Sequence, residues 1–148
     1  MAEFYEALAR GKQIEELILS MIKPKYPKAH IIDGYFKDYD IYIPEKGFGV
    51  EVKCDEMSKH TRNIVIEVEF DGKKSALSTT KAEYWVFYTG EEIIWIEPEV
   101  LKEIILSYPL VQFCGKGDTK FKKAYLVKKS HIIRNALLCS PLPTLPNL

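Results

Sequence analysis

Two acids and a lysine in the first half of the sequence carry residue types suited to metal-assisted hydrolysis. Ten residues separate Asp40 from Glu51, and Lys53 follows two positions later. Side chains alternate between the two faces of a strand, so Glu51 and Lys53 share a face if this segment is extended. Carboxylate oxygens suit hard cations such as Mg2+ or Mn2+. A neighbouring lysine would neutralise a phosphate or orient the attacking water. The pattern therefore favours metal-dependent cleavage of nucleic acid.

A four-residue turn positions these side chains. Pro44–Gly47 has turn composition and separates two short apolar segments, which predicts a hairpin in which Ile43 pairs with Phe48. This register places Asp40 directly opposite Glu51. Opposed residues have Cβ atoms about 4.5–5.5 Å apart, and two carboxylates at that distance repel unless a proton or a cation compensates. A divalent metal ion would supply the compensation.

An acid on one strand followed by Glu-x-Lys on the next resembles the signature of the PD-(D/E)XK nuclease superfamily. The resemblance implies a restriction-endonuclease-like fold of the α/β class, with an αβββαβ core in which helices flank a mixed central sheet. It also implies an endonuclease that uses Mg2+ or Mn2+ to hydrolyse phosphodiester bonds in DNA. Asp40 and Glu51 would then bind the metal, and Lys53 would complete the catalytic set. Tyr39 stands where the family signature has proline.

The resemblance extends upstream to the first expected helix. Gly11-Lys12-Gln13-Ile14-Glu15 is similar to the Gly-x-x-x-Glu motif of Holliday-junction resolvases. This similarity implies that Glu15 is a further catalytic carboxylate and metal ligand, and it makes branched DNA the sharpest substrate hypothesis. Glu16 remains the alternative, because the apolar stripe of the helix fixes its buried face better than the borders of that face.

Later segments are similar to a phage and prokaryotic branch of these nucleases. They are Ser75–Val86 and Gly117–Val127, and they imply a gene carried by a phage or mobile element. In such folds the helix after Glu-x-Lys often carries a polar residue near the metal or the substrate, so Thr79 and Lys81 are candidates for nucleic-acid contact. A plain exposed position is the equal alternative for both. Glu67 is a lower-ranked candidate for supporting the metal site.

A plain surface strand is the competing interpretation of the motif. Glu51 and Lys53 would then form a solvated ion pair that contributes little to stability. Asp38 would face Lys53 across the hairpin, and it is the reserve candidate for the first acid. Two other functional hypotheses are a catalytically inactive nuclease fold that binds nucleic acid or protein, and an enzyme unrelated to nucleases. No phosphate-binding loop or nucleophile elbow supports the unrelated enzyme.

Composition is compatible with one globular domain. The chain has 148 residues, of which 47% are hydrophobic, enough for a core. We expect a single domain over residues 1–139 and a Pro/Leu-rich tail over 140–148 that is either flexible or docks its leucines on a partner subunit. The odd, widely spaced cysteines Cys54, Cys114 and Cys139 predict free thiols. The sequence has neither a membrane-span pattern nor a secretory-signal pattern, so we expect a cytoplasmic protein with no membrane partner.

Charge is the main evidence against a nucleic-acid enzyme. The formal net charge is zero, whereas phosphate contacts usually leave a basic footprint. Seven basic residues nevertheless gather near the C-terminus: Lys116, Lys120, Lys122, Lys123, Lys128, Lys129 and Arg134. Of these we predict DNA contacts for Lys120, Lys122 and Lys123; a lysine-rich edge strand is the equal alternative. Acids gather separately at Glu91, Glu92, Glu97, Glu99 and Glu103, which predicts an electrically two-sided molecule. Because paired active sites suit the cutting of two strands, we expect a homodimer.

The remaining pattern predicts the order of elements. We expect helices over residues 4–22, 73–82 and 98–107, and strands over 29–32, 64–70, 84–88, 93–96 and 123–127, in addition to the hairpin. Residues 54–63 are expected to be a loop. A helix over residues 73–82 that crosses between the strands over 64–70 and 84–88 favours parallel pairing of these two strands.

Overall fold

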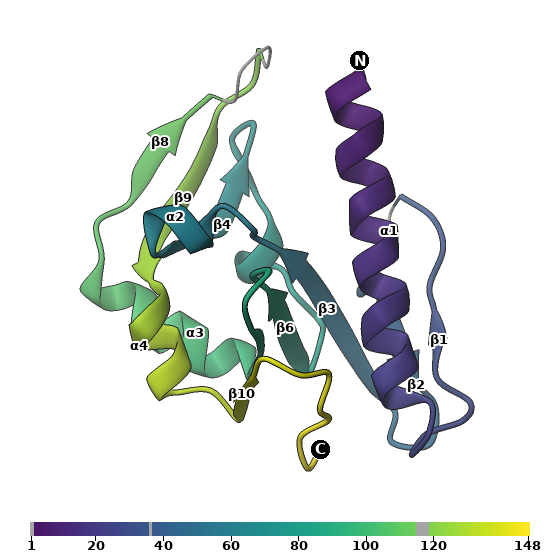
Figure 1. Cartoon of the computed structure of the whole chain (residues 1–148). Coiled ribbons are helices and arrows are strands. Elements are labelled where there is room, and N and C mark those ends of the chain that lie inside the picture. The colour runs from purple at the N-terminus through teal and green to yellow at the C-terminus, as the bar shows by residue number, and fades with distance from the viewer. Residues whose placement is uncertain (1, 36, 115–118) are drawn as a thin grey trace.

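Two sheets and four α-helices make up the computed structural model, which describes residues 2–35, 37–114 and 119–148 (Figure 1). Within this part of the chain, one sheet has six strands in the order β1-β2-β3-β6-β7-β10 and the other has four in the order β5-β4-β9-β8. The first sheet consists of β1 (His30–Ile31), β2 (Ile41–Ile43), β3 (Phe48–Cys54), β6 (Tyr84–Tyr88), β7 (Ile93–Ile96) and β10 (Leu138–Ser140). The second consists of β4 (Asn63–Phe70), β5 (Lys73–Lys74), β8 (Val111–Phe113) and β9 (Lys122–Lys128).

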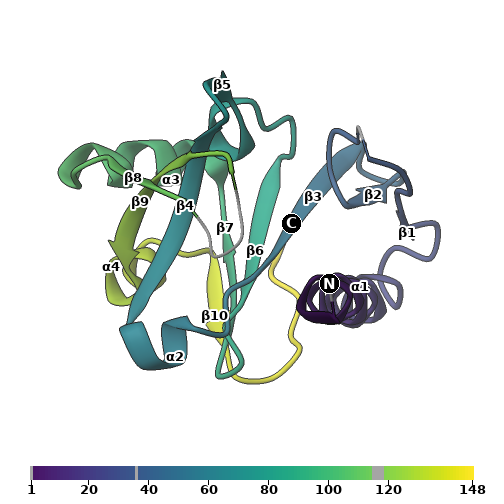
Figure 2. The ribbon, with the colours of Figure 1, turned by 90° about the horizontal axis from the view of Figure 1, so that it is seen from above.

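The helices lie on both sides of the larger sheet. They are α1 (Ala2–Ile22), α2 (Ser58–Thr61), α3 (Pro98–Ile104) and α4 (Lys129–Arg134), with 3-10 turns η1 (Ala76–Ser78) and η2 (Ile105–Ser107). Helix α1 stands on one side of β2 and β3, and the smaller sheet lies across the molecule from it (Figure 2). The larger sheet is mixed, because β3 pairs with β6 in parallel and its other pairings are antiparallel. The predicted α/β class with a mixed sheet is confirmed.

Alternate residues of the central strands enter two separate cores. Val86 and Trp95 pack with the buried face of α1, whereas Trp85, Phe87 and Ile94 pack with α3 and the smaller sheet. A strand covered on both faces needs apolar residues at every position. This requirement explains the uninterrupted apolar runs in β6 and β7, both of which are at the positions predicted for strands.

The hairpin of β2 and β3 has the predicted register. Ile43 lies opposite Phe48 and Ile41 lies opposite Val50. Gly47 closes the turn with a φ of 68°, a conformation that glycine adopts without strain. Asp40, just before β2, and Glu51, just after Val50, therefore lie at the same end of the hairpin. Strand β3 pairs with β6 in parallel. The parallel pairing expected between the strands over 64–70 and 84–88 is wrong, because β4 and β6 lie in different sheets.

The connection between β3 and β6 differs from the prediction. The helix expected over residues 73–82 is wrong: this stretch holds β5, η1 and irregular chain. Asp71 and Gly72 both have positive φ, at 51° and 77°, which is the geometry of a tight hairpin turn. This turn folds Lys73 back opposite Phe70, so the chain continues as a strand, and β4 pairs with β9 to build the second sheet. The loop expected over residues 54–63 likewise contains the short helix α2.

The C-terminal tail returns to the body of the chain. Leu145 and Leu148 pack against the core that includes the buried face of α1, so these two leucines of the tail dock on their own chain, whereas Leu142 is exposed. Cys54 and Cys139 are free thiols, as predicted. Among the described helices, none combines the length and the apolar character needed to span a bilayer.

Candidate active site

Asp40 is a buried carboxylate with both oxygens engaged. It precedes β2, where its backbone N–H donates to the Val50 carbonyl over 3.0 Å. The Val52 N–H donates to Oδ2 over 2.7 Å, and the Lys37 ammonium lies 2.9 Å from Oδ1. Only 7% of the residue is exposed. The hairpin backbone therefore fixes the carboxylate of Asp40 toward the end of β3.

Glu51 and Lys53 share a face of β3, as the alternation predicts. Glu51 Oε2 lies 3.3 Å from Lys53 Nζ, and Lys53 Nζ lies 5.2 Å from the centre of the Trp85 ring. The side chain of Glu51 is 21% exposed. Burial raises its pKa; the charge and hydrogen bond of Lys53 oppose this, the charge of Asp40 and a hydrogen bond with it add to it, and the net pKa is about 7. This glutamate is not a freely solvated surface residue.

Glu15 joins the same group from α1. Its side chain is 17% exposed, and Oε2 lies 3.9 Å from Lys37 Nζ. Burial raises the pKa of Glu15, and the negative charge of Asp40 adds to this effect. Glu16, by contrast, is exposed. Of the two adjacent glutamates, Glu15 is therefore the one that lies with the acids of the hairpin.

Lys37 belongs to this group and was missed by the sequence analysis. It lies within ion-pair distance of both Asp40 and Glu15. Burial lowers its pKa, but the hydrogen bond and charge of Asp40 and the charges of Glu15 and Glu51 outweigh burial, so the net pKa is raised. The only sequence signal for Lys37 is its position three residues before Asp40. Together, Glu15, Lys37, Asp40, Glu51 and Lys53 form what we call the acid cluster.

The donor chemistry of the acid cluster fits a hard divalent cation. All of its candidate ligands are carboxylate oxygens, which Mg2+ and Mn2+ prefer. The charge of Asp40 raises the pKa of both Glu15 and Glu51, and a bound cation would remove this repulsion. As the described side chains stand, no group of three or more His, Cys, Asp and Glu is arranged to hold a metal ion. Metal binding at Asp40 Oδ1 would require displacement of Lys37.

A small polar pocket opens beside Glu51. Its volume is about 330 Å3, and its lining residues are Lys37, Asp38, Glu51, Ala76, Thr79, Thr80 and Lys81. Thr79 and Lys81 thus lie near Glu51, although they occupy a loop after η1 and not the predicted helix. Asp38 forms an ion pair with Lys81 at 3.5 Å, which corrects the expected pairing of Asp38 with Lys53.

Glu67 supports this pocket indirectly. Its Oε2 accepts a hydrogen bond from the Ser75 hydroxyl at 2.8 Å. Ser75 precedes Ala76, whose φ of 46° is unusual for a residue with a side chain. Glu67 therefore anchors the start of the loop that forms one wall of the pocket.

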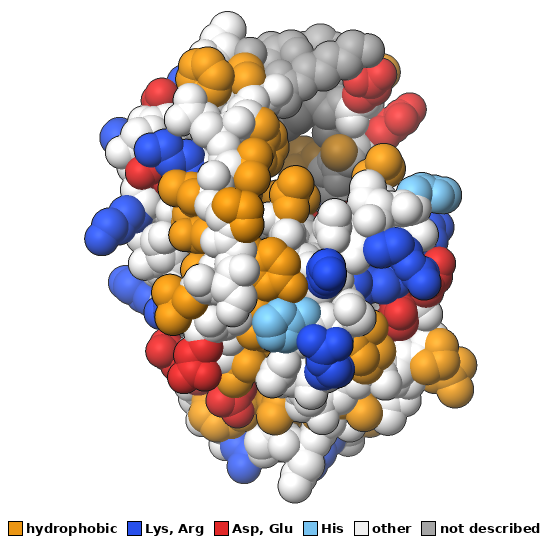
Figure 3. Space-filling view, turned by 90° about the vertical axis from the view of Figure 1, so that its left-hand side faces the viewer, with side chains coloured by type: hydrophobic (Ala, Val, Ile, Leu, Met, Phe, Trp, Pro, Cys, Tyr) orange, Lys and Arg blue, Asp and Glu red, His pale blue; other side chains and the backbone are white. Residues whose placement is uncertain are grey.

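The predicted DNA-binding lysines of the C-terminal segment lie in the smaller sheet. Lys120 pairs with Asp71, Lys123 pairs with Glu69, and Lys122 lies 5.9 Å from the centre of the Phe70 ring. The structure thus joins them to β4 and its turn, not to the acid cluster. Figure 3 shows the side of the molecule that carries β8 and β9, where lysines are interspersed with apolar side chains. Lys116 lies outside the described residues.

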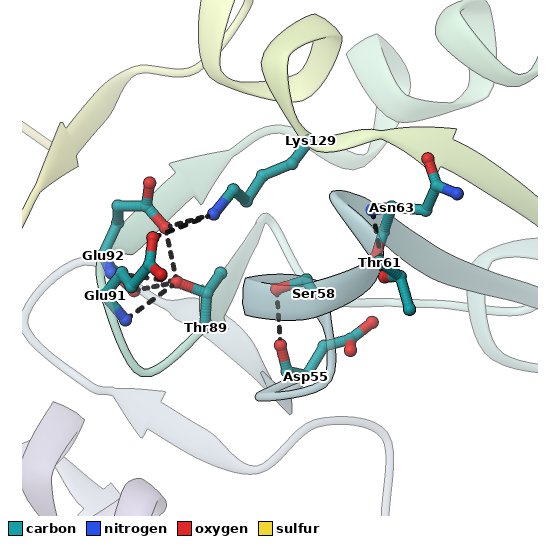
Figure 4. A network of polar contacts seen from close by, with 8 residues as sticks. All are labelled: Asp55, Ser58, Thr61, Asn63, Thr89, Glu91, Glu92 and Lys129. Carbon is teal, nitrogen blue, oxygen red and sulfur yellow. Dashed lines mark hydrogen bonds and ion pairs between the residues drawn. The ribbon is translucent and has the colours of Figure 1, made fainter.

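Lys129 joins the basic segment to the acidic one, contrary to the predicted two-sided charge distribution. Only 5% of Lys129 is exposed. Its ammonium lies 3.0 Å from Glu92 and 3.5 Å from Glu91, and Thr89 donates a hydrogen bond to Glu92 (Figure 4). The Lys129 backbone N–H also donates to the Arg62 carbonyl. This network fastens the start of α4 to the turn between β6 and β7.

Gly49 provides the space for Tyr39, the residue before Asp40. A Cβ atom at Gly49 would overlap the Tyr39 ring, which stacks on Tyr42. We expect Gly49→Ala to lower the free energy of unfolding by about 1–3 kcal/mol, because overpacking displaces the ring. Urea unfolding would measure the loss. The double variant with Tyr39→Ala should lose less free energy of unfolding than the two single variants lose together. Strict additivity of these losses would contradict the contact.

No family model, no curated protein and no solved structure matches this chain. The chemistry of the acid cluster is therefore inferred from its own residues.

Proposed function

We propose that this protein is a divalent-metal-dependent endonuclease that hydrolyses phosphodiester bonds in DNA. The observation that carries the proposal is the convergence of Glu15, Asp40 and Glu51 with two lysines, from a helix, a strand end and a strand that are distant in sequence. Gathering three carboxylates in a partly buried site is costly unless a cation is bound there at some stage. A soluble fold has little structural reason to maintain such a group.

Each residue has a role in the proposed reaction. Glu15, Asp40 and Glu51 would hold Mg2+ or Mn2+, which supplies Lewis acidity and a water of lowered pKa when bound. The ammonium of Lys53 would donate hydrogen bonds to a phosphate oxygen or to the attacking water. Thr79 and Lys81, in the pocket beside Glu51, would contact the adjoining backbone. Charge on the pentavalent transition state is thereby stabilised by groups already in position.

The topology supports a restriction-endonuclease-like core as part of the proposal. Helix α1, the antiparallel strands β1, β2 and β3, and β6 added in parallel beside β3 follow the expected order. The departure is the crossover, where β4, β5 and η1 replace the helix. We propose DNA as the substrate, the cytoplasm as the place of action and a homodimer as the working form, with branched DNA as the preferred structure.

An inactive binding module is the second candidate, and one observation favours it. The carboxylates already have internal cationic partners, since Lys37 lies beside Glu15 and Asp40 while Lys53 lies beside Glu51. A site that had lost its metal could be stabilised in this way. Metal binding separates the two candidates, because only the nuclease requires Lys37 to yield its place to a cation.

Cleavage of labelled duplex, flap, four-way-junction and single-stranded DNA tests the proposal directly. We expect cutting in Mg2+ or Mn2+ and none in EDTA, and we expect Lys53→Ala to slow it by about 10²-fold, the cost of losing one preorganised charge. Lys102→Ala is the matched control, because Lys102 forms its ion pair with Glu99 on the surface of α3. If no substrate is cut and calorimetry detects no metal binding, the inactive module replaces the nuclease.

A further inference from the structure

A second, larger groove adjoins the acid cluster. It has a volume of about 830 Å3 and lies between α1 and the segment that follows β1, with Glu15 and Lys37 among its lining residues. Lys37 also lines the pocket beside Glu51. The acid cluster therefore stands between two depressions, of which the small one is mainly polar and the large one has an apolar floor that includes Ala7, Leu8 and Ile31. The volume of the large groove is in the range of sites that hold small ligands.

Gly11 leaves space within this groove. It lies in the middle of α1, where glycine is the least favourable residue apart from proline. A Cβ atom at Gly11 would meet nothing within 4 Å, so packing does not require a glycine there. Gly11 lines the groove. The missing side chain thus enlarges the groove and has no other evident use in the fold.

Tyr35 places an unused aromatic ring at the rim. It lines the groove and is 99% exposed, whereas aromatic side chains usually bury much of their surface. Lys12 supplies positive charge along the groove; the other lysine of the lining, Lys37, is already paired with two carboxylates of the acid cluster. Asp33 and Glu16 supply carboxylates that can accept hydrogen bonds from the amino groups of a base. An aromatic face, an apolar floor and flanking positive charge are the elements that bind an unpaired nucleotide.

We propose that this groove binds an unpaired nucleotide next to the cleavage position, with its base stacked on Tyr35. The inference rests on the proposed function, because the groove reaches the acid cluster through Glu15 and Lys37. A base within a duplex is stacked and cannot offer its face to Tyr35, so the nucleotide must belong to a single strand or be extruded. The preferred substrates are therefore those with an unpaired segment beside the scissile phosphate.

Equilibrium binding of a labelled single-stranded oligonucleotide, and of the same sequence as a blunt duplex, tests the groove. The full-length protein is used with Ca2+ in place of Mg2+, so that the carboxylates are neutralised. Gly11→Leu fills the open space from a helix position where leucine is favourable, and Tyr35→Ala removes the ring. We expect each variant to weaken single-strand binding by about tenfold or more and duplex binding by less than about twofold.

Ala9→Leu is the matched control, because Ala9 is exposed on α1 and does not line the groove. Oligonucleotides carrying 2-aminopurine supply a second readout, since stacking on Tyr35 should quench its fluorescence in the wild type but not in Tyr35→Ala. Unchanged single-strand affinity in Gly11→Leu and Tyr35→Ala would overturn the inference, and so would equal losses for single strand and duplex. Neither result depends on cleavage. If the wild type cuts DNA while these variants bind normally, the nuclease proposal stands and the groove inference fails. If the wild type does not cut DNA but its binding depends on the groove, only the nuclease proposal is rejected.

Discussion

Glu51→Gln is expected to abolish cleavage and, in the absence of metal, to stabilise the protein at pH 8. Burial raises the pKa of Glu51 to about 7 in the folded chain, above its ordinary value near 4.3 when unfolded. The folded state then binds the proton more tightly than the unfolded state. The unfolding free energy of the wild type therefore falls as the pH rises between these two values, by roughly 2–3 kcal/mol in all. Glutamine carries no charge and removes this loss.

Urea unfolding at pH 5 and pH 8 in EDTA measures this effect. At pH 8 the free energy of unfolding of Glu51→Gln should exceed that of the wild type. At pH 5 most of this difference should disappear. Glu69→Gln is the matched control, since Glu69 also pairs with a lysine, Lys123 at 3.2 Å, but in the smaller sheet. Identical pH dependence in Glu51→Gln and wild type would show that Glu51 is an ordinary solvated carboxylate.

Metal and activity complete this prediction. Mg2+ or Mn2+ should raise the melting temperature of the wild type at pH 8, because a cation that binds only the folded state stabilises it by mass action. Glu51→Gln should show little of that rise, and its cleavage rate should fall by about 10³-fold, as expected for loss of a metal ligand in an electrostatically stabilised reaction. A variant that keeps full activity would exclude Glu51 from the active site.

Lys129→Met is expected to destabilise the fold by about 3 kcal/mol at pH 7. Lys129 is buried, and its removal leaves Glu92 facing Glu91 with no cation between them. Removing one partner of a buried ion pair usually costs about 3–5 kcal/mol; the partial exposure of the two glutamates places this pair at the lower end. Lys128→Met, at the neighbouring exposed position, should change stability little. Chemical unfolding of both variants checks the difference.

The loss caused by Lys129→Met should shrink in acid. Burial raises the pKa of Glu92, but hydrogen bonds from Thr89 and Lys129 outweigh burial and lower it overall. Because its folded-state pKa is lowered, Glu92 stabilises the protein at pH values above the ordinary pKa of a glutamate. That contribution disappears as the pH falls through the folded-state pKa. Adding Glu92→Gln to Lys129→Met should likewise restore part of the stability. No recovery by either route would contradict the pairing.

Local sequence patterns were sufficient for the hairpin of the site. The composition of Pro44–Gly47 fixed the turn, and the turn fixed the register that brings Asp40 and Glu51 to the same end of the hairpin. Alternation placed Glu51 and Lys53 on one face, whereas Glu15 was chosen over Glu16 from the similarity of its Gly-x-x-x-Glu segment. These predictions succeeded because each depends on residues close together in the chain.

Non-local contacts account for what was missed. Lys37 lies in a loop, and its role becomes visible only when α1 places Glu15 beside it. Lys129 was counted as part of a basic surface, whereas its partners Glu91 and Glu92 come from a distant turn. The helix expected after β4 is wrong for another reason. The tight hairpin turn at Asp71–Gly72 folds the chain back on β4, although the segment that follows is long enough for a helix.

The connection between β3 and β6 is built from strands, and this sets the order in which the parts of the proposed active site form in a nascent chain. Glu15, Asp40 and Glu51 are all synthesised early. The loop with Thr79 and Lys81 is held to β4, whose partner β9 is among the last strands to be synthesised. Contacts between such distant segments form late, because the intervening chain must first be closed into a loop. The carboxylates would therefore leave the ribosome long before the opposite wall of their pocket.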